Sequence, residues 1–368
     1  MKANSKSSLD SEEAVFAHRL LSWFDEHGRH NLPWQQDITP YRVWVSEIML
    51  QQTQVSTVIP YYLRFMESFP YVQDLAAASE DDVLHHWTGL GYYARGRNLL
   101  RAAKTVVEKF AGQFPSDPAD LETLPGIGRS TAAAIASISF NSRHAILDGN
   151  VKRVLCRVYA IDTSPYETTT LQRLWDIADR LMPESRCADY TQAIMDLGAT
   201  VCTRTKARCH ECPMQSVCAA FKSGTPAAYP APRQRKKLPE RRCRMLVIRN
   251  PQGEILLQKR PPQGIWGGLW SLPQFDDQTA AQTHCLDITG HSPSSESRGQ
   301  IFRHTFSHYH LDIEPVYLSI GAAVPEVNDN DVQLWYRPGE HKIGLAAPVK
   351  KILEQPAATV LQLPLEQA

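Results

Sequence analysis

Glu47 is an acid within a segment that is otherwise mostly apolar. The run VWVSEIML over residues 43–50 predicts a helix that is apolar around most of its circumference and therefore central in its domain. A carboxyl group in such surroundings resists ionisation and can act as a general acid near neutral pH. The alternative role is that of a buried polar anchor that accepts backbone hydrogen bonds.

Asp148 is a second acid with a defined local setting. It follows the apolar residues HAIL and precedes GNVKRV, so it is placed as the N-cap of the next helix. A carboxylate fixed at the end of an apolar, strand-like stretch could also face a cationic reaction centre.

Four of the eight cysteines lie within a short segment, as Cys202, Cys209, Cys212 and Cys218. Their spacing, C-x6-C-x2-C-x5-C, allows four thiolates to surround one metal centre, and it favours an iron-sulfur cluster over zinc, which is typically bound by two C-x2-C pairs. Two disulfides are the alternative, which an intracellular location disfavours. Arg204, Lys206 and Arg208 in the first loop could contact phosphate, or could simply be solvated.

The run LPGIGRS, residues 124–130, predicts a tight turn that leads into a helix. Gly126 and Gly128 allow backbone conformations and close approaches that other residues forbid, and the free N–H groups at the helix start favour an anion such as phosphate. An ordinary turn between helices is the alternative.

The elements that must position these residues form two dissimilar parts. From about residue 11 to 221 nearly every segment has helical character, with runs near 40–57, 60–68, 80–87, 92–110, 129–139, 149–159, 170–181 and 187–200. After a Pro-rich basic segment come short aliphatic strands, with a hairpin about Pro251-Gln252-Gly253 and helical patches near 278–286 and 346–355. We therefore expect a helical domain over 1–221, a linker over 222–243 and an α+β domain over 244–368.

Composition gives further expectations. Basic and acidic residues cancel at 39 each, yet eight Lys or Arg residues against the single acid Glu240 lie between Lys222 and Arg244. No apolar run has the length of a membrane span and the first residues do not resemble a signal peptide, so we expect a soluble, cytoplasmic protein with no membrane partner.

In combination, the LPGIG turn, Asp148 and the cysteine spacing over residues 11–221 resemble the endonuclease III-like, helix-hairpin-helix superfamily of DNA glycosylases. The runs SEIMLQQTQV, HHWTGLGYYARGRNL and ILDGNVKRV are similar to its adenine DNA glycosylase branch. The resemblance implies a multidomain fold, with an all-α domain that carries a [4Fe-4S] cluster on the four cysteines. It also implies a monomeric enzyme that acts on duplex DNA and removes adenine paired with 8-oxoguanine or guanine.

Site residues follow from the same resemblance. Glu47 would protonate the flipped adenine and help to manage the attacking water, Asp148 would stabilise the cationic sugar, and Asn150 would support Asp148. Arg29 and Trp34 would line the adenine pocket, and Gln52 and Tyr92 would fill the base stack, with the neighbouring Tyr93 in the core. Gly126 and Gly128 would hold the DNA backbone.

Ser130 stands where members of the superfamily that also cut the strand carry a lysine. A hydroxyl group cannot form the Schiff base of those enzymes, so a monofunctional glycosylase is expected. Hydrogen bonding at a helix start is the structural alternative for Ser130.

The C-terminal part resembles the Nudix fold through IWGGLWSLPQF and FRHTFSHYHLDI. Between Trp266 and Gly290 there is no Glu, so we expect no Nudix hydrolase chemistry. The resemblance marks Phe306, Ser307 and His308 as the reader of 8-oxoguanine. A zinc site on the alternating histidines near His308, or a plain edge strand, are the alternatives.

Two other functions remain open from the sequence. One is a bifunctional glycosylase and lyase for oxidised pyrimidines, which Ser130 and the extra C-terminal domain disfavour. The other is a non-catalytic protein that binds damaged DNA, which the presence of both Glu47 and Asp148 disfavours.

Overall fold

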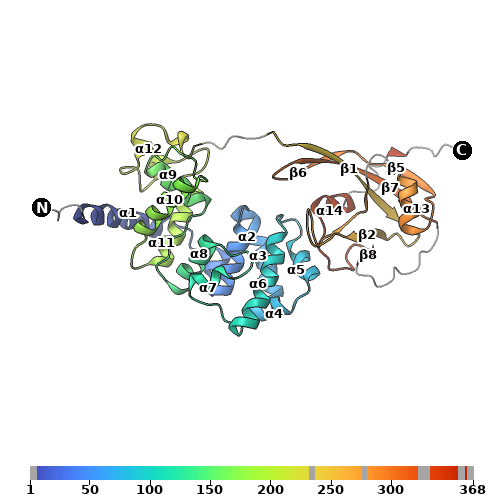
Figure 1. The fold of residues 1–368 in the computed structure, drawn as a ribbon, viewed down its shortest axis with the longest axis horizontal. Helices are drawn as coiled ribbons and strands as arrows, with labels where there is room; N and C mark the ends of the chain where they lie inside the picture. The colour runs from blue at the N-terminus through green and yellow to red at the C-terminus, as the bar shows by residue number, and fades with distance from the viewer. Residues whose placement is uncertain (1–5, 232–236, 276–279, 322–331, 355–360, 363–368) are drawn as a thin grey trace. The chain divides into compact units, whose positions relative to one another are not determined.

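The computed structural model describes residues 6–231, 237–275, 280–321, 332–354 and 361–362. The chain folds into two compact units (Figure 1). The first contains residues 1–77 and 101–235, and the second contains residues 78–100 and 236–368. An all-helical part and an α+β part are thus both present, as the sequence predicts.

The first unit is a bundle of short helices (Figure 1). Its α-helices are α1 (Lys6–His27), α2 (Pro40–Leu50), α3 (Val55–Ser68), α4 (Val72–Ala77), α7 (Pro118–Glu122), α8 (Arg129–Phe140), α9 (Gly149–Val158), α10 (Thr168–Leu181), α11 (Cys187–Asp196) and α12 (Ala219–Lys222), together with most of α6 (Ala94–Phe110). Short 3-10 turns occur at η1 (Pro33–Gln35), η3 (Cys209–Glu211) and η4 (Pro226–Ala228), and a π-helix, η2 (Leu197–Val201), continues α11.

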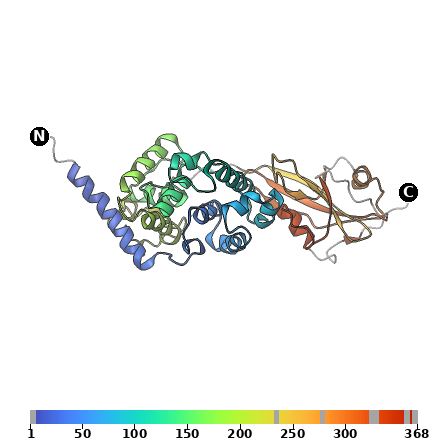
Figure 2. The same cartoon turned by 90° about the horizontal axis from the view of Figure 1, so that it is seen from below.

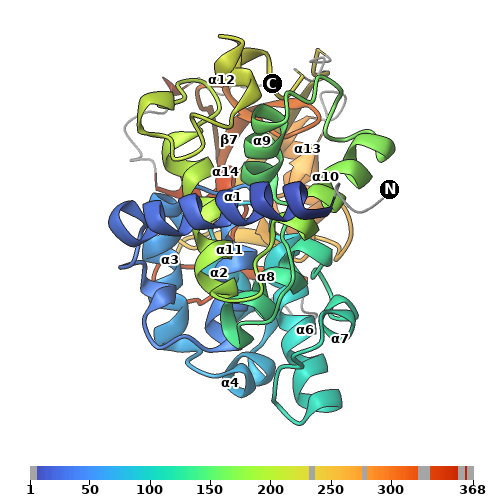
Figure 3. The same ribbon diagram turned by 90° about the vertical axis from the view of Figure 1, so that its left-hand side faces the viewer.

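Helix α2 lies at the centre of this bundle because its sequence leaves little polar surface. Trp44 and Val45 are completely buried, and α2 packs against α3 and α8. Thr39 caps its start by accepting a hydrogen bond from the Arg42 N–H group at 3.2 Å. Figure 3 shows α1 crossing α11, with which it packs.

The expected continuous helix over 40–57 is wrong, because residues 51–54 separate α2 from α3. Gln52 adopts the left-handed conformation, with φ of 57°, which no α-helix can contain. The break consists of the polar run QQTQ and contains neither Gly nor Pro, which is why the sequence did not mark it. The break carries Gln52 out of the helix and onto a cavity wall.

The second unit contains a twisted mixed sheet (Figure 2). Its strands are β1 (Glu240–Arg249), β2 (Ile255–Lys259), β3 (Trp270–Ser271), β4 (Gln274–Phe275), β5 (Ser295–Arg298), β6 (Phe302–Thr305), β7 (His310–Ser319), β8 (Gln333–Tyr336) and β9 (Leu361–Gln362). In the described part of the chain, the sheet order is β3-β2-β1-β7-β5-β9, with β4 on β1, β6 on β7 and β8 on β2.

The predicted hairpin is confirmed, since β1 and β2 pair antiparallel. Strand β1 also pairs in parallel with β7, from Glu240 opposite His310 to Arg249 opposite Ser319. The predicted helical patches correspond to α13 (Ala281–Thr289), which packs on β1 and β7, and α14 (Ala347–Leu353). Leu246, Leu318 and Cys285 form part of the core between sheet and helix.

Helix α5 (Glu80–Trp87) and the residues after it belong to the second unit. The Asp81 carboxylate accepts hydrogen bonds from Lys259 Nζ at 2.9 Å and from the Trp270 indole at 3.1 Å. The Tyr93 hydroxyl donates to the Leu345 carbonyl at 3.4 Å. Sequence spacing did not indicate this grouping, because it depends on contacts between distant segments.

The expected boundaries 1–221, 222–243 and 244–368 remain a proposal for parts that fold separately. Within the expected linker, η4 is helical and β1 begins at Glu240, before residue 244. None of the helices in the described ranges has the length and apolar character needed to cross a bilayer.

Candidate active site

A single cavity in the first unit collects seven of the residues singled out from the sequence. It contains about 1720 Å³ of empty space, part of it open to solvent. The seven residues in its wall are Arg29, Trp34, Glu47, Gln52, Ser130, Asp148 and Asn150. The acids, the expected pocket residues and one of the two expected stack-filling residues therefore share one space.

Glu47 reaches this cavity from α2. Burial, and then the nearby Asp148 carboxylate, raise the pKa of Glu47 to about 7. The described residues donate no hydrogen bond to its carboxyl group, so the structure does not support the anchor role. Near neutral pH a large fraction of Glu47 carries a proton, as a general acid requires.

Asp148 caps α9, as predicted. Its Oδ1 accepts a hydrogen bond from the Val151 N–H group at 2.7 Å, and its Oδ2 accepts one from Asn150 Nδ2 at 3.1 Å. Burial raises the pKa of Asp148, while the backbone N–H groups of Val151 and Asn150 counteract this. The capping role and a role in the cavity are therefore compatible, because the cap fixes the carboxylate in place.

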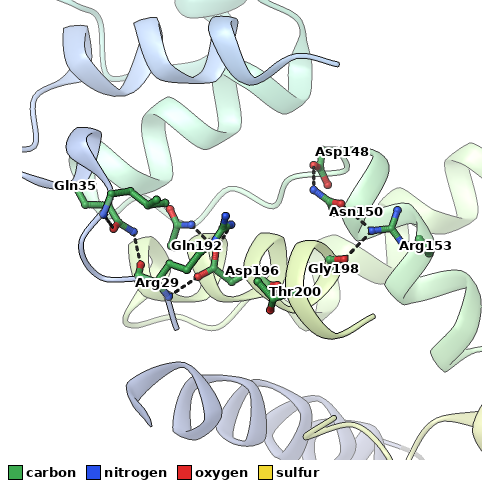
Figure 4. Close-up of polar contacts among 10 residues, drawn as sticks. Arg29, Gln35, Asp148, Asn150, Arg153, Gln192, Asp196, Gly198 and Thr200 are labelled. Carbon is green, nitrogen blue, oxygen red and sulfur yellow. Dashed lines mark hydrogen bonds and ion pairs between the residues drawn. The ribbon is translucent and has the colours of Figure 1, made fainter. Parts of the chain in front are cut away.

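Asn150 connects Asp148 to a second, partly buried network (Figure 4). Its Oδ1 accepts from Arg153 Nη2 at 2.8 Å. Arg153 also donates to the Gly198 carbonyl at 2.7 Å and, through Nε, to the Cys202 carbonyl at 2.8 Å. Hydrogen bonds thus run from the Asp148 carboxylate to the backbone of the first clustered cysteine.

Ser130 lies in the first turn of α8 and joins two segments. Its Oγ accepts a hydrogen bond from the Leu147 N–H group at 3.1 Å, next to Asp148. Gly128 is the N-cap residue of α8, without a side-chain cap. Ser130 thus does not cap its own helix, which was the structural alternative. Its hydroxyl instead holds the backbone of Leu147, the residue before Asp148.

Arg29 and Trp34 lie on the part of the cavity wall formed by the loop between α1 and α2. Trp34 is 6% exposed and its ring meets Tyr62 edge-on at 5.5 Å. Arg29 is held by Asp196 of α11, with Nη2 of Arg29 at 2.5 Å from Oδ1 of Asp196. Neither Asp196 nor the cavity residue Gln192 was singled out from the sequence. Their i, i+4 spacing on a helix was the available signal.

The glycine turn lies outside the cavity wall, between α7 and α8. Leu124 and Ile127 anchor it in the core, and the Ile127 N–H group bonds to the Leu124 carbonyl at 3.1 Å. Gly126 has φ of 83°, a conformation that favours glycine. Gly128 has an ordinary negative φ of −106°, so its backbone conformation does not require glycine. A Cβ built on Gly128 meets nothing within 4 Å. The space beside Gly128 is therefore free for a ligand.

The four clustered cysteines line a second cavity, which contains about 410 Å³ of empty space, part of it open to solvent. Burial, and then the nearby thiols Cys202, Cys218 and Cys209, raise the pKa of Cys212 to about 12, against an opposing hydrogen bond from the Met214 N–H group. Within the described ranges, no group of three or more His, Cys, Asp or Glu side chains is already arranged to hold a metal ion.

Arg157 is a buried cation beside these thiols, with 4% exposure. It donates to Cys202 Sγ at 3.3 Å and to backbone carbonyls such as that of Thr203 at 2.8 Å. No carboxylate among the described residues pairs with it. The three basic residues of the first cysteine loop, Arg204, Lys206 and Arg208, are exposed, and Arg208 pairs with Glu211 at 2.9 Å.

In the second unit, Tyr92 and Tyr93 differ as expected, with exposures of 49% and 7%. Tyr92 has φ of 49°, which turns the chain just before α6. The Arg95 guanidinium lies 5.4 Å from the Tyr92 ring centre and donates to the Gly91 carbonyl at 3.1 Å. Arg95 thus lies over the ring of the exposed Tyr92 in a cation–π contact.

Phe306, Ser307 and His308 form the tip of the hairpin between β6 and β7. Phe306 packs against Trp266 at 5.2 Å and Tyr309 at 4.7 Å between ring centres, whereas Ser307 and His308 are exposed. The tip is therefore an aromatic base with two exposed polar side chains, in which Ser307 Oγ lies 3.4 Å from His308 Nδ1. Asp276 and Asp277, two acids between Trp266 and Gly290, lie outside the described residues.

Two family models match the chain. Residues 45–180 match the HhH-GPD superfamily of base excision DNA repair proteins, and residues 244–355 match the NUDIX domain. The chain is 38% identical to the adenine DNA glycosylase of Buchnera aphidicola subsp. Schizaphis graminum, over 92% of this chain and 98% of that protein. The chain belongs to the adenine DNA glycosylase family.

Other relatives and solved structures agree with this membership. The human adenine DNA glycosylase is 35% identical, over 93% of this chain and 74% of that protein. A thermostable thymine-DNA glycosylase superposes with a TM-score of 0.53 at 25% identity, covering 58% of this chain and 98% of that one. A non-covalent endonuclease III–DNA complex gives 0.50 at 18% identity over 58% of this chain and 97% of that one, which shows a shared fold. The predicted fold class, a helix-hairpin-helix domain with a Nudix-like C-terminal domain, is confirmed.

Proposed function

We propose that the protein is a monofunctional DNA glycosylase that hydrolyses the N-glycosidic bond of adenine paired with 8-oxoguanine, or with guanine, in duplex DNA. The observation that carries this proposal is the pairing of Glu47, whose pKa is raised to about 7, with the capped Asp148 in one cavity. Family membership supports the same activity, since the curated relatives are named adenine DNA glycosylases.

Adenine must leave the base stack before its glycosidic bond can be reached. In the cavity, protonated Glu47 donates its proton to N7 of adenine. The bond between C1′ and N9 then breaks and its electron pair stays with the base, which leaves as neutral adenine. The cationic sugar is stabilised by the Asp148 carboxylate, and water adds to C1′ with loss of its proton to Glu47.

The reaction stops at an abasic site because Ser130 supplies no amine that could attack C1′. The hydrogen bond from the Leu147 N–H group to the Ser130 hydroxyl holds the backbone next to Asp148 in place. Strand cleavage by the purified protein in step with adenine release, without heat or alkali, contradicts this part of the proposal.

The duplex is bound by residues outside the cavity together with Gln52 on its wall. The α7–α8 turn binds a backbone phosphate, supported by the open space beside Gly128 and the free N–H groups at the start of α8. Gln52 and the exposed Tyr92 fill or wedge the stack around the mismatch. Ser307 and His308, on the aromatic base at the hairpin tip, read the 8-oxoguanine.

A [4Fe-4S] cluster fits the residues of the second cavity. Cys202, Cys209, Cys212 and Cys218 line one space, and the buried Arg157 supplies a cation that an anionic cluster would balance. When bound, the cluster would cross-link the loop after η2 and so hold the segment to which Arg153 is bonded. Chemical analysis for iron and inorganic sulfide, as against zinc, tests this assignment.

A single-turnover assay tests the activity against the two alternatives. Duplexes that contain adenine opposite 8-oxoguanine, adenine opposite guanine, or thymine glycol are compared at saturating protein. We expect excision of adenine from the first two and none of thymine glycol. Excision of thymine glycol with strand cleavage supports the bifunctional alternative, and tight binding without any excision supports a binding protein.

A further inference from the structure

Asp196 is a fully buried carboxylate, with 0% exposure, at the end of α11. It contacts Arg29 and Gln192 (Figure 4), which both line the active-site cavity, whereas Asp196 itself does not. Its oxygens accept hydrogen bonds from the Arg29 N–H group at 2.7 Å, from Arg29 Nε at 3.0 Å and from Gln192 Nε2 at 2.8 Å. A buried carboxylate is costly unless it is paired, and here the pairing joins two residues of the cavity wall.

This carboxylate determines the orientation of the Gln192 amide. An ionised carboxylate can only accept hydrogen bonds, so Gln192 must turn its NH₂ group toward Asp196. The amide oxygen, Oε1, is then directed away from Asp196. Because Gln192 lines the cavity, the group it can offer to a ligand is an acceptor.

Asp196 has a comparable effect on Arg29. Nε and Nη2 of Arg29 both bond to Oδ1 of Asp196, and no acceptor in the described part of the chain engages Nη1. The Arg29 carbonyl is itself held by Gln35 Nε2 at 2.7 Å, so the loop that bears Arg29 is fixed. Arg29 therefore offers a positioned donor beside the Gln192 acceptor.

We propose that Asp196 is a positioning residue that selects adenine over 6-oxopurines, by holding Gln192 as an acceptor and Arg29 as a donor on the cavity wall. Adenine presents an amine donor at C6 beside ring-nitrogen acceptors, which complements this pair. Hypoxanthine and guanine present an oxygen at C6, which would face the Gln192 oxygen without a proton between them. The inference rests on the proposed adenine excision.

The test is Asp196→Asn, which keeps the side-chain shape and introduces an NH₂ group. That group can donate to Gln192 Oε1, so the Gln192 amide is free to turn its own NH₂ group toward the cavity. Single-turnover excision of adenine and of hypoxanthine is measured in otherwise identical duplexes opposite 8-oxoguanine. We expect the adenine-to-hypoxanthine rate ratio to fall about tenfold or more relative to the wild type. Comparing each variant with the wild type cancels the intrinsic difference between the two leaving groups.

The control is Asp189→Asn on the same helix. Asp189 pairs with Arg186 at 2.8 Å, is exposed, and does not line the cavity. The adenine-to-hypoxanthine rate ratio of the Asp189→Asn variant should equal that of the wild type. Equal loss of both rates in Asp196→Asn, with the ratio unchanged, overturns the proposal and assigns Asp196 a purely structural role.

Gln192→Leu keeps the test independent of how well Asp196→Asn folds. Because leucine offers no acceptor, the rate of adenine excision should fall. Leucine offers no donor to hypoxanthine either, so the adenine-to-hypoxanthine rate ratio should fall as well. An unchanged ratio in this variant also overturns the proposal. A wild type that excises neither base refutes both the proposed function and this inference, whereas an active wild type with an unchanged ratio in the variants refutes the inference alone.

Discussion

Gly198 and Asn150 lie in such close contact that no other residue fits at position 198. A Cβ built on Gly198 falls 2.5 Å from Asn150 Cβ and 3.1 Å from its Cα, so backbone as well as side chain obstructs it. Gly198 belongs to the π-helix η2, and a π-helix often marks a functional site. Here it brings α11 against the start of α9, where Asp148 and Asn150 are held.

Gly198→Ala should therefore displace Asn150 and, through it, the Asp148 carboxylate. We expect the single-turnover rate of adenine excision to fall about 100-fold, as for a displacement near 1 Å at a reacting centre. Gly149→Ala is the matched control, because a Cβ at Gly149 meets nothing within 4 Å. If the two variants excise adenine at equal rates, the contact between Gly198 and Asn150 does not position the site.

The pH dependence of excision should report on Glu47. Its pKa is raised to about 7, so the proton needed for donation is present below pH 7 and is lost as pH rises through 7. The single-turnover rate should therefore decline on the alkaline side of about pH 7. Glu47→Gln should abolish excision at every pH while binding of the mismatched duplex is retained, and an equal loss of binding points to a structural acid.

Glu47 should also make the folded protein less stable as pH rises. Between its ordinary pKa of 4.5 and about 7 the folded state holds a proton that the unfolded state has released, so the free energy of unfolding decreases with pH. Glu47→Gln removes this cost, and near pH 8 it should stabilise the protein by up to about 3 kcal/mol. Urea unfolding of the wild type and of Glu47→Gln at pH 5 and pH 8 measures this difference in the free energy of unfolding. A variant that is equally or less stable than the wild type at pH 8 contradicts the raised pKa.

Arg153 should connect the cysteine loop to the catalytic acid. Arg153→Ala removes the bonds to Asn150, Gly198 and Cys202, each of which contributes about 1 kcal/mol when satisfied, and leaves three partly buried acceptors without that donor. We expect a loss of about 3 kcal/mol in stability together with slower excision. Arg173→Ala, on the neighbouring α10, serves as the control, and unchanged excision after Arg153→Ala excludes a link to Asp148.

His308→Ala should weaken discrimination between adenine opposite 8-oxoguanine and adenine opposite guanine. His308 is exposed at the hairpin tip, so its loss should raise the dissociation constant for the 8-oxoguanine duplex about tenfold without slowing excision from a saturated complex. His291→Ala, in the turn after α13, should change neither quantity. If the His308 variant binds each of the two duplexes with the same affinity as the wild type, the assignment of His308 to 8-oxoguanine recognition is wrong.

Much of the fold was predictable because it depends on local pattern. Helical periodicity located α8, α9 and α10, and the turn at Pro251-Gln252-Gly253 located the β1–β2 hairpin. The capping role of Asp148 followed from its place before a helix. The break at residues 51–54 was missed, because the run QQTQ contains neither Gly nor Pro to mark it.

The amino-acid sequence by itself determined which chemical groups are available: two acids, a serine in place of an amine, and four thiols at close spacing. Only the tertiary structure decided which of them act together. It placed Glu47 and Asp148 in one cavity, and it put the buried Asp196 behind Arg29 and Gln192, which come from segments far apart in the chain. The physical reason is that pKa values and hydrogen-bond roles depend on burial and on neighbours in space, and sequence spacing records neither across distant segments.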